Sequence, residues 1–312
     1  MLEGKDKYIK MKQPRKERTI VILTIIPSII AVGVFVYGFI AWSIRVALSD
    51  WIGIKPDYTF AGLKNFISLF KSGRFLIDIY NNIFFTILFL AICVGGGLLL
   101  AILLDQFIKG EGIFRTVYLF PLAISPVVTA VVWKWIFSPK VGVNVLLTNL
   151  LSKIGIERTI EFGWYTSPAS WGPFNIALIP IIIAASWWFV GYVMAMYLAA
   201  LRGIPAELRE AARVDGASEF KIYMKIILPL LKPITLSALI ILGHISLKMF
   251  DLVYVMTGRG TGFVTDFPSI FMYETTFAAN KFSQGAAISL VMLAMVAVVI
   301  IPYLTISLRK ET

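Results

Sequence analysis

Residues 204–233 read IPAELREAARVDGASEFKIYMKIILPLLKP, a polar stretch of mixed charge that lies between two long apolar runs. Pro205 suits the first turn of a helix, where its missing N–H costs nothing, and Gly216 readily adopts the left-handed conformation that ends a helix. Ser218 is placed to cap a second helix, which Pro229 is expected to end. The stretch therefore predicts two short helices joined at a glycine, which we call the elbow.

Each predicted elbow helix has an apolar face. In the first helix Leu208, Ala211 and Ala212 share one face, and the two alanines are expected to be exposed to a partner. The second helix carries a similar stripe, made of Phe220, Met224 and Ile227. Between residues 207 and 225 four basic side chains are matched by four acidic ones. Such a surface suits a protein partner with charges of both signs better than nucleic acid or anionic lipid.

The composition indicates a membrane protein. With 58% apolar and 15% charged residues, the 312-residue chain is too apolar for an ordinary soluble domain. Its formal net charge of +11 is not accompanied by a nucleic-acid motif, and the basic residues cluster beside apolar runs, as membrane topology requires. The single cysteine, Cys93, lies inside an apolar run, which excludes a disulfide framework or a cysteine-based metal site.

Six apolar runs are long enough to cross about 30 Å of hydrocarbon at about 1.5 Å per residue. They cover residues 20–44, 81–104, 116–137, 174–201, 233–253 and 283–308. Residues 1–19 form a basic tail before the first run, which is longer than the apolar region of a signal peptide and has no small-residue cleavage site after it. We therefore expect an all-α integral membrane protein with six transmembrane helices, in which Gly95, Gly96 and Gly97 make a close helix contact.

Basic residues also predict the orientation. With the N-terminus inside the cell, 17 of the 29 Lys and Arg residues lie on the cytoplasmic side. Six spans place both termini on that side. The elbow then faces the cytoplasm, where ATP is available.

Three classes of function are open to a protein of this kind. The chain has no G-x-x-x-x-G-K-[ST] sequence, so its energy must come from an ATPase in another chain or from an ion gradient. Ion relays need ionisable groups deep in the membrane, and His244, Lys248 and Asp251 lie toward one end of the fifth run. An intramembrane enzyme is disfavoured by one histidine, one cysteine and no H-E-x-x-H. An ion-gradient-driven secondary carrier stays the alternative to an ATP-driven subunit.

Several segments carry a resemblance to a known family. They are Glu210-Ala211-Ala212, Asp215-Gly216-Ala217, Ile226-Ile227-Leu228-Pro229, Phe250-Asp251-Leu252-Val253-Tyr254-Val255-Met256-Thr257-Gly258 and Gly62-Leu63-Lys64-Asn65-Phe66. The elbow resembles the EAA signature of permease subunits of binding-protein-dependent ATP-binding-cassette (ABC) importers. The likeness is greatest to the carbohydrate-uptake branch, and within it to the maltose-type first permease.

The resemblance implies a type I ABC importer permease fold, with a cytoplasmic basic tail at 1–19, a permease domain at 20–312 and a cytoplasmic coupling loop at 202–232. In this family the elbow is the coupling helix that sits in a cleft of the ATPase subunit. The coupling residues implied here are Glu210, Ala211, Ala212, Asp215 and Gly216.

The implied partners are a second homologous permease, two ABC ATPase subunits, an extracytoplasmic solute-binding protein, a carbohydrate and membrane lipids, with no nucleic acid. ATP and Mg are then bound by the partner subunits, and this chain carries no cofactor, catalytic residue or metal site. The implied location is the cytoplasmic (inner) membrane of a bacterium or archaeon.

The two runs that flank the elbow are expected to bind the substrate. Sugars are held by aromatic faces together with a few hydrogen-bonding groups, and the centres of these runs offer that mixture. The predicted binding residues are Ser186, Trp188, Tyr192, Ser246 and Met249. Trp188 and Tyr192 are four residues apart and share a helical face, whereas Trp187 points about 100° away. The pattern leaves open which carbohydrate is carried.

Overall fold

The computed structural model describes residues 15–106, 108–172 and 174–308, which form helices and one short hairpin. The helices are α1 (Arg15–Val32), α2 (Phe39–Ala47), α3 (Lys64–Lys71), α4 (Gly73–Leu104), α5 (Glu111–Leu119), α6 (Pro126–Ile136), α7 (Val143–Lys153), α8 (Ile179–Arg202), α9 (Ala206–Val214), α10 (Glu219–Ile222), α11 (Leu228–Leu230), α12 (Lys232–Leu247), α13 (Asp251–Met256), α14 (Pro268–Tyr273) and α15 (Phe282–Leu308). Strands β1 (Ser170–Trp171) and β2 (Phe174–Asn175) pair antiparallel, with Ser170 opposite Asn175.

The long apolar helices agree with part of the predicted topology. Within the described residues three helices are long and apolar enough to cross a membrane: Ile22–Ala47, Gly73–Leu104 and Ile176–Arg202. Two bent pairs of helices raise that number to five if each pair counts as one span. The expected six spanning helices are therefore not confirmed, although the all-helical fold is. Most of the predicted tail, residues 1–14, lies outside the described residues, and α1 begins at Arg15.

The third predicted run, 116–137, is not one helix. α5 passes into a short 3-10 turn (Phe120–Ala123), and α6 then leaves at an angle of 101°. The break lies before Pro126, which disfavours a helical conformation at Ser125, where ψ is 140°. Ile124 is extended as well, with a ψ of 139°. Ser125 caps the new helix by accepting a hydrogen bond from the Val127 N–H. Hydropathy detected the apolar run and could not detect this change of direction.

The fifth predicted run, 233–253, is also interrupted. α12 ends at Leu247, and α13 begins as a separate helix at Asp251. The expectation that the second elbow helix ends at Pro229 is wrong. The helix continues through a π-helical turn (Tyr223–Ile227) to Leu230 and then bends by 60° into α12. The wider turn shifts the helical hydrogen-bond register just before the proline, and such turns and prolines are the usual causes of kinks.

The core of the bundle is the long contact between α4 and α8. Gly97 allows the close approach, because a Cβ built on it would lie 2.7 Å from the Val193 side chain and 2.9 Å from the Met194 nitrogen. A Cβ on Gly96 would lie 3.1 Å from Val190, whereas Gly95 faces open space. The predicted close contact is thus confirmed at Gly96 and Gly97. The Tyr197 hydroxyl joins α8 to α12 by donating to Thr235 at 2.8 Å.

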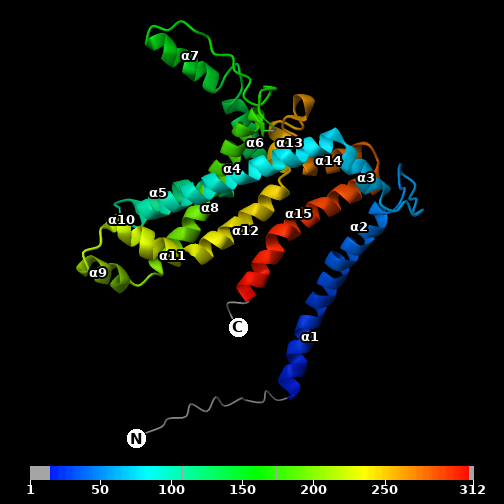
Figure 1. Ribbon diagram of the computed structural model, residues 1–312, viewed down its shortest axis with the longest axis horizontal. Coiled ribbons are helices and arrows are strands. Elements are labelled where there is room, and N and C mark those ends of the chain that lie inside the picture. Colours follow the sequence, from blue (N-terminus) through cyan, green and yellow to red (C-terminus); the bar gives the residue numbers. More distant parts are fainter. Residues whose placement is uncertain (1–14, 107, 173, 309–312) are drawn as a thin grey trace.

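The helices are arranged so that the two ends of the bundle differ (Figure 1). The elbow, α9 and α10, lies at one end, and α7, α13 and α14 lie at the other. The helix formed by α1 and α2 runs along the side of the bundle, and no part of its most apolar stretch is buried by the rest of the chain. In the span that contains α8, 61% of the most apolar stretch is buried. α8 is therefore the central helix, and it leads directly into the elbow.

Candidate functional site

The elbow has the local geometry that its sequence predicts. Gly216 has a φ of +75°, and its N–H donates to Arg213 O at 3.0 Å, which closes the end of α9. The Ser218 side chain then accepts a hydrogen bond from Lys221 N and caps α10. An added side chain at Gly216 would meet no neighbour, but it would be strained by the left-handed backbone. The turn is thus fixed by backbone conformation rather than by packing.

Ion pairs hold the elbow against the bundle. Arg209 donates to the buried carboxylate of Asp105 at 2.8 Å, which joins α9 to the end of α4. Arg213 donates to Glu219 at 2.6 Å and links α9 to α10. This hydrogen bond from the guanidinium lowers the pKa of the exposed Glu219 carboxyl. No local pattern indicates the Arg209–Asp105 pair, because its members are 104 residues apart in the chain.

The predicted coupling residues divide into exposed and buried positions. Glu210, Ala211, Asp215 and Gly216 are exposed, and Glu210 lines a cleft of about 430 Å³ beside Asp105. Ala212 is 8% exposed and packs into the core, so the expected exposed alanine face holds for Ala211 and is wrong for Ala212. The reason is helical phase, since the side of α9 that carries Ala212 rests on the bundle.

The elbow also presents large apolar side chains to its surroundings. The exposed fractions are 87% for Val214, 75% for Phe220 and 51% for Met224. Ile227, the third member of the predicted second stripe, is fully buried. The stripe is therefore split between the core and the surface. Exposed apolar groups gathered on one segment and rimmed by charges indicate an interaction surface.

The predicted substrate residues lie on the helices expected to carry them. Ser186, Trp188 and Tyr192 are on α8, where Ser186 is 4% exposed and the two aromatic residues are partly buried. Within the described part of the chain, the Ser186 hydroxyl and the Trp188 indole N–H are buried without hydrogen-bond partners. Both groups are therefore available to a ligand or to water.

Of the other two predicted substrate residues, Ser246 lies in the last turn of α12 and Met249 lies two residues after its end. Ser246 is fully buried, and its hydroxyl donates to Gly243 O at 2.8 Å and accepts from Thr86 at 3.0 Å. Met249 is 6% exposed, and its carbonyl accepts a hydrogen bond from Ser269 at 2.6 Å. Ser246 is thus engaged with α4, unlike Ser186.

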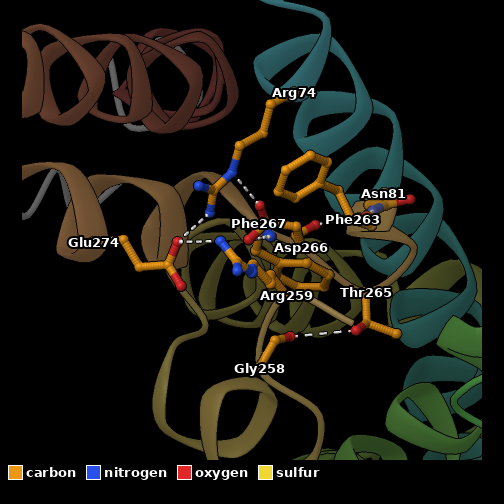
Figure 2. Close-up of polar contacts among 9 residues, drawn as sticks. All are labelled: Arg74, Asn81, Gly258, Arg259, Phe263, Thr265, Asp266, Phe267 and Glu274. Atoms are coloured by element: carbon orange, nitrogen blue, oxygen red, sulfur yellow. Dashed lines mark hydrogen bonds and ion pairs between the residues drawn. The ribbon is translucent and has the colours of Figure 1, made fainter. Parts of the chain in front are cut away.

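A polar network at the end opposite the elbow was not predicted. Arg74 donates to Asp266 at 2.6 Å and to Glu274 at 2.8 Å (Figure 2). Its guanidinium lies over the rings of Phe263 and Phe271, 4.8 and 4.3 Å from their centroids. These contacts tie the start of α4 to the chain between α13 and α15. These contacts cannot be predicted from local sequence patterns, because the bonded residues are about 190 positions apart.

Asn81 extends the same network. Its side-chain amide donates to the carbonyls of Phe263 and Asp266, both at 3.0 Å, and accepts from Asn175 at 2.7 Å. Asp78, one turn earlier on α4, is fully buried beside Asp266. The network thus joins α4, β2 and the loop after α13 into one unit.

Comparison with known proteins places these features in a family. The family model described as "Binding-protein-dependent transport system inner membrane component" matches residues 93–308, which include the elbow and α12 to α15. The chain belongs to this family. The family membership predicted from the elbow sequence is thereby confirmed, and the chain is a transport component rather than an enzyme.

Individual relatives span nearly the whole chain. A probable ABC transporter permease protein of Pyrococcus horikoshii is 42% identical over 93% of this chain and 96% of the relative. The xylose/arabinose import permease XacH of Haloferax volcanii is 36% identical over 88% of this chain and 84% of the relative. The trehalose/maltose permease MalF of Thermococcus litoralis is 29% identical over 96% of this chain and 98% of the relative.

A solved structure shares the fold. A chain of a bacterial ABC transporter involved in the import of the acidic polysaccharide alginate matches with a TM-score of 0.73 and 24% sequence identity. The match covers 91% of this chain and 94% of that one. The fold is therefore that of an ABC importer permease.

Proposed function

We propose that this chain is one of two permease subunits of an ATP-driven carbohydrate importer, and that it is coupled to an ATPase through the elbow. Membership of the family and the sugars named for XacH and MalF support the substrate class. The observation that carries the proposal is the elbow surface, on which Val214, Phe220 and Met224 stand exposed beside charges of both signs. The remaining partners are a second, homologous permease, two ATPase subunits and an extracytoplasmic solute-binding protein.

Some charged residues of the elbow form ion pairs within the chain, and others are exposed. Arg209 and Arg213 are committed to Asp105 and Glu219 within the chain. Glu210, Asp215 and two lysines stay exposed and are available to the ATPase. An ATPase cleft that covers Phe220 would bury apolar area and align these charges. Movement of the ATPase would then be transmitted to α8 and α12, the two helices between which the elbow lies.

The orientation follows from this coupling. The ATPase works in the cytoplasm, so the elbow (202–232), the N-terminal tail (1–19) and the C-terminus face the cytoplasm in an inner membrane. The permease domain (20–312) contributes half of the translocation pathway, and the second permease contributes the rest. ATP and Mg are bound by the ATPase subunits.

The proposed sugar site lies between α8 and α12. The Trp188 indole N–H supplies a hydrogen-bonding group that the described chain leaves unpaired. The Ser186 hydroxyl is unpaired as well, but it points about 160° away from Trp188 around α8 and would meet a sugar only from the other side of the helix. Tyr192 adds an aromatic ring on the face of Trp188, and Ser246, in the last turn of α12, and Met249, in the turn after it, are the proposed contacts on the other side. This combination of aromatic faces and few polar groups is typical of sites that bind carbohydrates.

Glu210→Lys tests the coupling role. Among the described residues, the exposed Glu210 carboxylate belongs to neither ion pair of the elbow, although its charge favours the charged form of Arg213, so the variant is expected to insert and fold normally while losing transport and transport-coupled ATP hydrolysis. Glu157→Lys, an exposed substitution in the loop after α7, is the matched control. Normal coupling in Glu210→Lys would show that the elbow is a simple connector.

A further inference from the structure

α13 lies at the end of the bundle opposite the elbow (Figure 1). A second cleft is formed there by residues of α13 and of the loop that follows it, together with other segments. It measures about 590 Å³, within the usual range of small-molecule sites. Residues from several separate segments line it: Lys134, Tyr165, Thr166, Tyr254, Met256 to Thr261 and Glu274. None of these residues belongs to the proposed membrane site on α8 and α12.

The cleft contains a fixed aromatic ring. Tyr254 is 41% exposed, and its ring stacks on Phe250 at a centroid distance of 5.0 Å with an interplanar angle of 16°. Tyr273 packs edge-on against it at 5.4 Å. The ring is therefore held in place by its neighbours while part of its surface stays open. Tyr165 contributes a second ring from another segment of the lining.

Polar groups in the cleft retain hydrogen-bonding capacity. The Arg259 side chain is 56% exposed and stands 3.6 Å from the Glu274 carboxylate, beyond a good hydrogen bond. Lys134 reaches the Val255 carbonyl at 3.5 Å and keeps further donors. Aromatic rings together with these donors and one carboxylate match the alternating C–H faces and hydroxyl groups of a sugar.

The wall of the cleft is rigid because the Arg74 network lies behind it (Figure 2). Glu274, which lines the cleft, accepts a hydrogen bond from Arg74 at 2.8 Å. On the other side, Thr265 donates to Gly258 O at 3.2 Å and closes the loop that forms the rim. Gly260 has a φ of +68°, and a Cβ there would collide with the Thr265 hydroxyl. The rim is thus preorganised rather than loose.

We infer that this cleft is an outer subsite for a saccharide, which a sugar occupies before it reaches the membrane site. The inference rests on the proposed function. A small-molecule occupant is favoured because the cleft is concave and of ligand size, with its polar groups converging from several segments. The stack of Tyr254 on Phe250 also places the cleft beside the turn after α12, in which Met249 of the proposed membrane site lies.

Protection of a single cysteine from a maleimide tests the subsite. The variant is Thr261→Cys, an exposed rim position, with the buried native Cys93 changed to Ser. The assembled transporter is placed in nanodiscs without binding protein, and xylose, maltose, trehalose or glycerol 3-phosphate is added. The sugar that the transporter takes up is expected to slow modification at Thr261→Cys severalfold. Lys140→Cys, which lines a neighbouring cleft, is the control and should be unaffected.

Substitutions of the ring complete the test. Tyr254→Ala should abolish protection, Tyr254→Phe should retain it, and Tyr80→Ala on the exposed side of α4 should have no effect. Unchanged modification in the presence of a sugar that the transporter imports would overturn the subsite and leave the proposed function standing. Protection by sugar-free binding protein and not by sugar would assign the cleft to protein docking, which also overturns it. If the complete transporter, with its binding protein and ATP, imports no carbohydrate at all, the proposed function fails and the subsite is rejected with it.

Discussion

Truncation of Phe220 to Ala is expected to weaken binding of the ATPase to the elbow. The side chain is 75% exposed on the elbow, with neighbours such as Val214 and Met224 that are also exposed. Burying a whole phenylalanine side chain is worth about 1.5–3 kcal/mol, so covering the exposed three-quarters contributes about 1–2 kcal/mol. That corresponds to roughly a tenfold change in the dissociation constant.

The dissociation constant is measured between the purified ATPase subunit and the permease pair in nanodiscs. The control is Phe35→Ala, because Phe35 is 78% exposed and lies on the helix at the side of the bundle, away from the elbow. Phe220→Ala should lower the affinity roughly tenfold, and Phe35→Ala should leave it unchanged. Equal affinities for wild type and Phe220→Ala would refute the assignment of this surface to the ATPase.

Further substitutions test other parts of the structure. Gly216→Val should leave membrane insertion intact and abolish coupled ATP hydrolysis, because a β-branched residue is strained at a φ of +75°; normal coupling would argue against a fixed turn. Gly97→Val should lower the melting temperature by overpacking the α4–α8 contact, at a cost of about 1–3 kcal/mol, and Gly95→Val, which faces open space, should not. Arg74→Met leaves the buried Asp266 without its ion-pair partner and Glu274 with Arg259 alone, so thermal unfolding should show a loss of about 3–5 kcal/mol, and wild-type stability would exclude a structural role for the network. Trp188→Ala should impair transport without weakening ATPase binding, and wild-type uptake would place the sugar site elsewhere.

Local features of the elbow were predictable from the sequence because they depend on neighbouring residues. The left-handed Gly216 and the Ser218 cap follow from backbone preferences that act over three or four positions. The direction of the chain at Pro126 did not follow, since hydropathy records how apolar a run is and not whether it bends. Ala212 was misplaced for a related reason: helical spacing identifies a face but not what that face contacts.

Long-range contacts explain the other omissions. The Arg74 network and the Arg209–Asp105 pair join residues that are roughly 100 to 190 positions apart, and a single sequence does not show which distant charges meet. The outer cleft was missed with them, because Tyr254 and Glu274 come from different segments of the chain. Tyr254 belongs to a segment that resembles the family. That resemblance drew attention to the segment but did not indicate that its side chains line a cleft.

Uptake by reconstituted proteoliposomes tests the central claim most directly. The chain is reconstituted with its second permease, ATPase subunits and binding protein, and uptake of the sugars named for its relatives is followed with and without ATP. We predict accumulation of a sugar that requires both ATP and the binding protein, and none with this chain by itself. Uptake by this chain alone, driven by a proton or sodium gradient without ATP, would contradict the account and identify an ion-driven carrier.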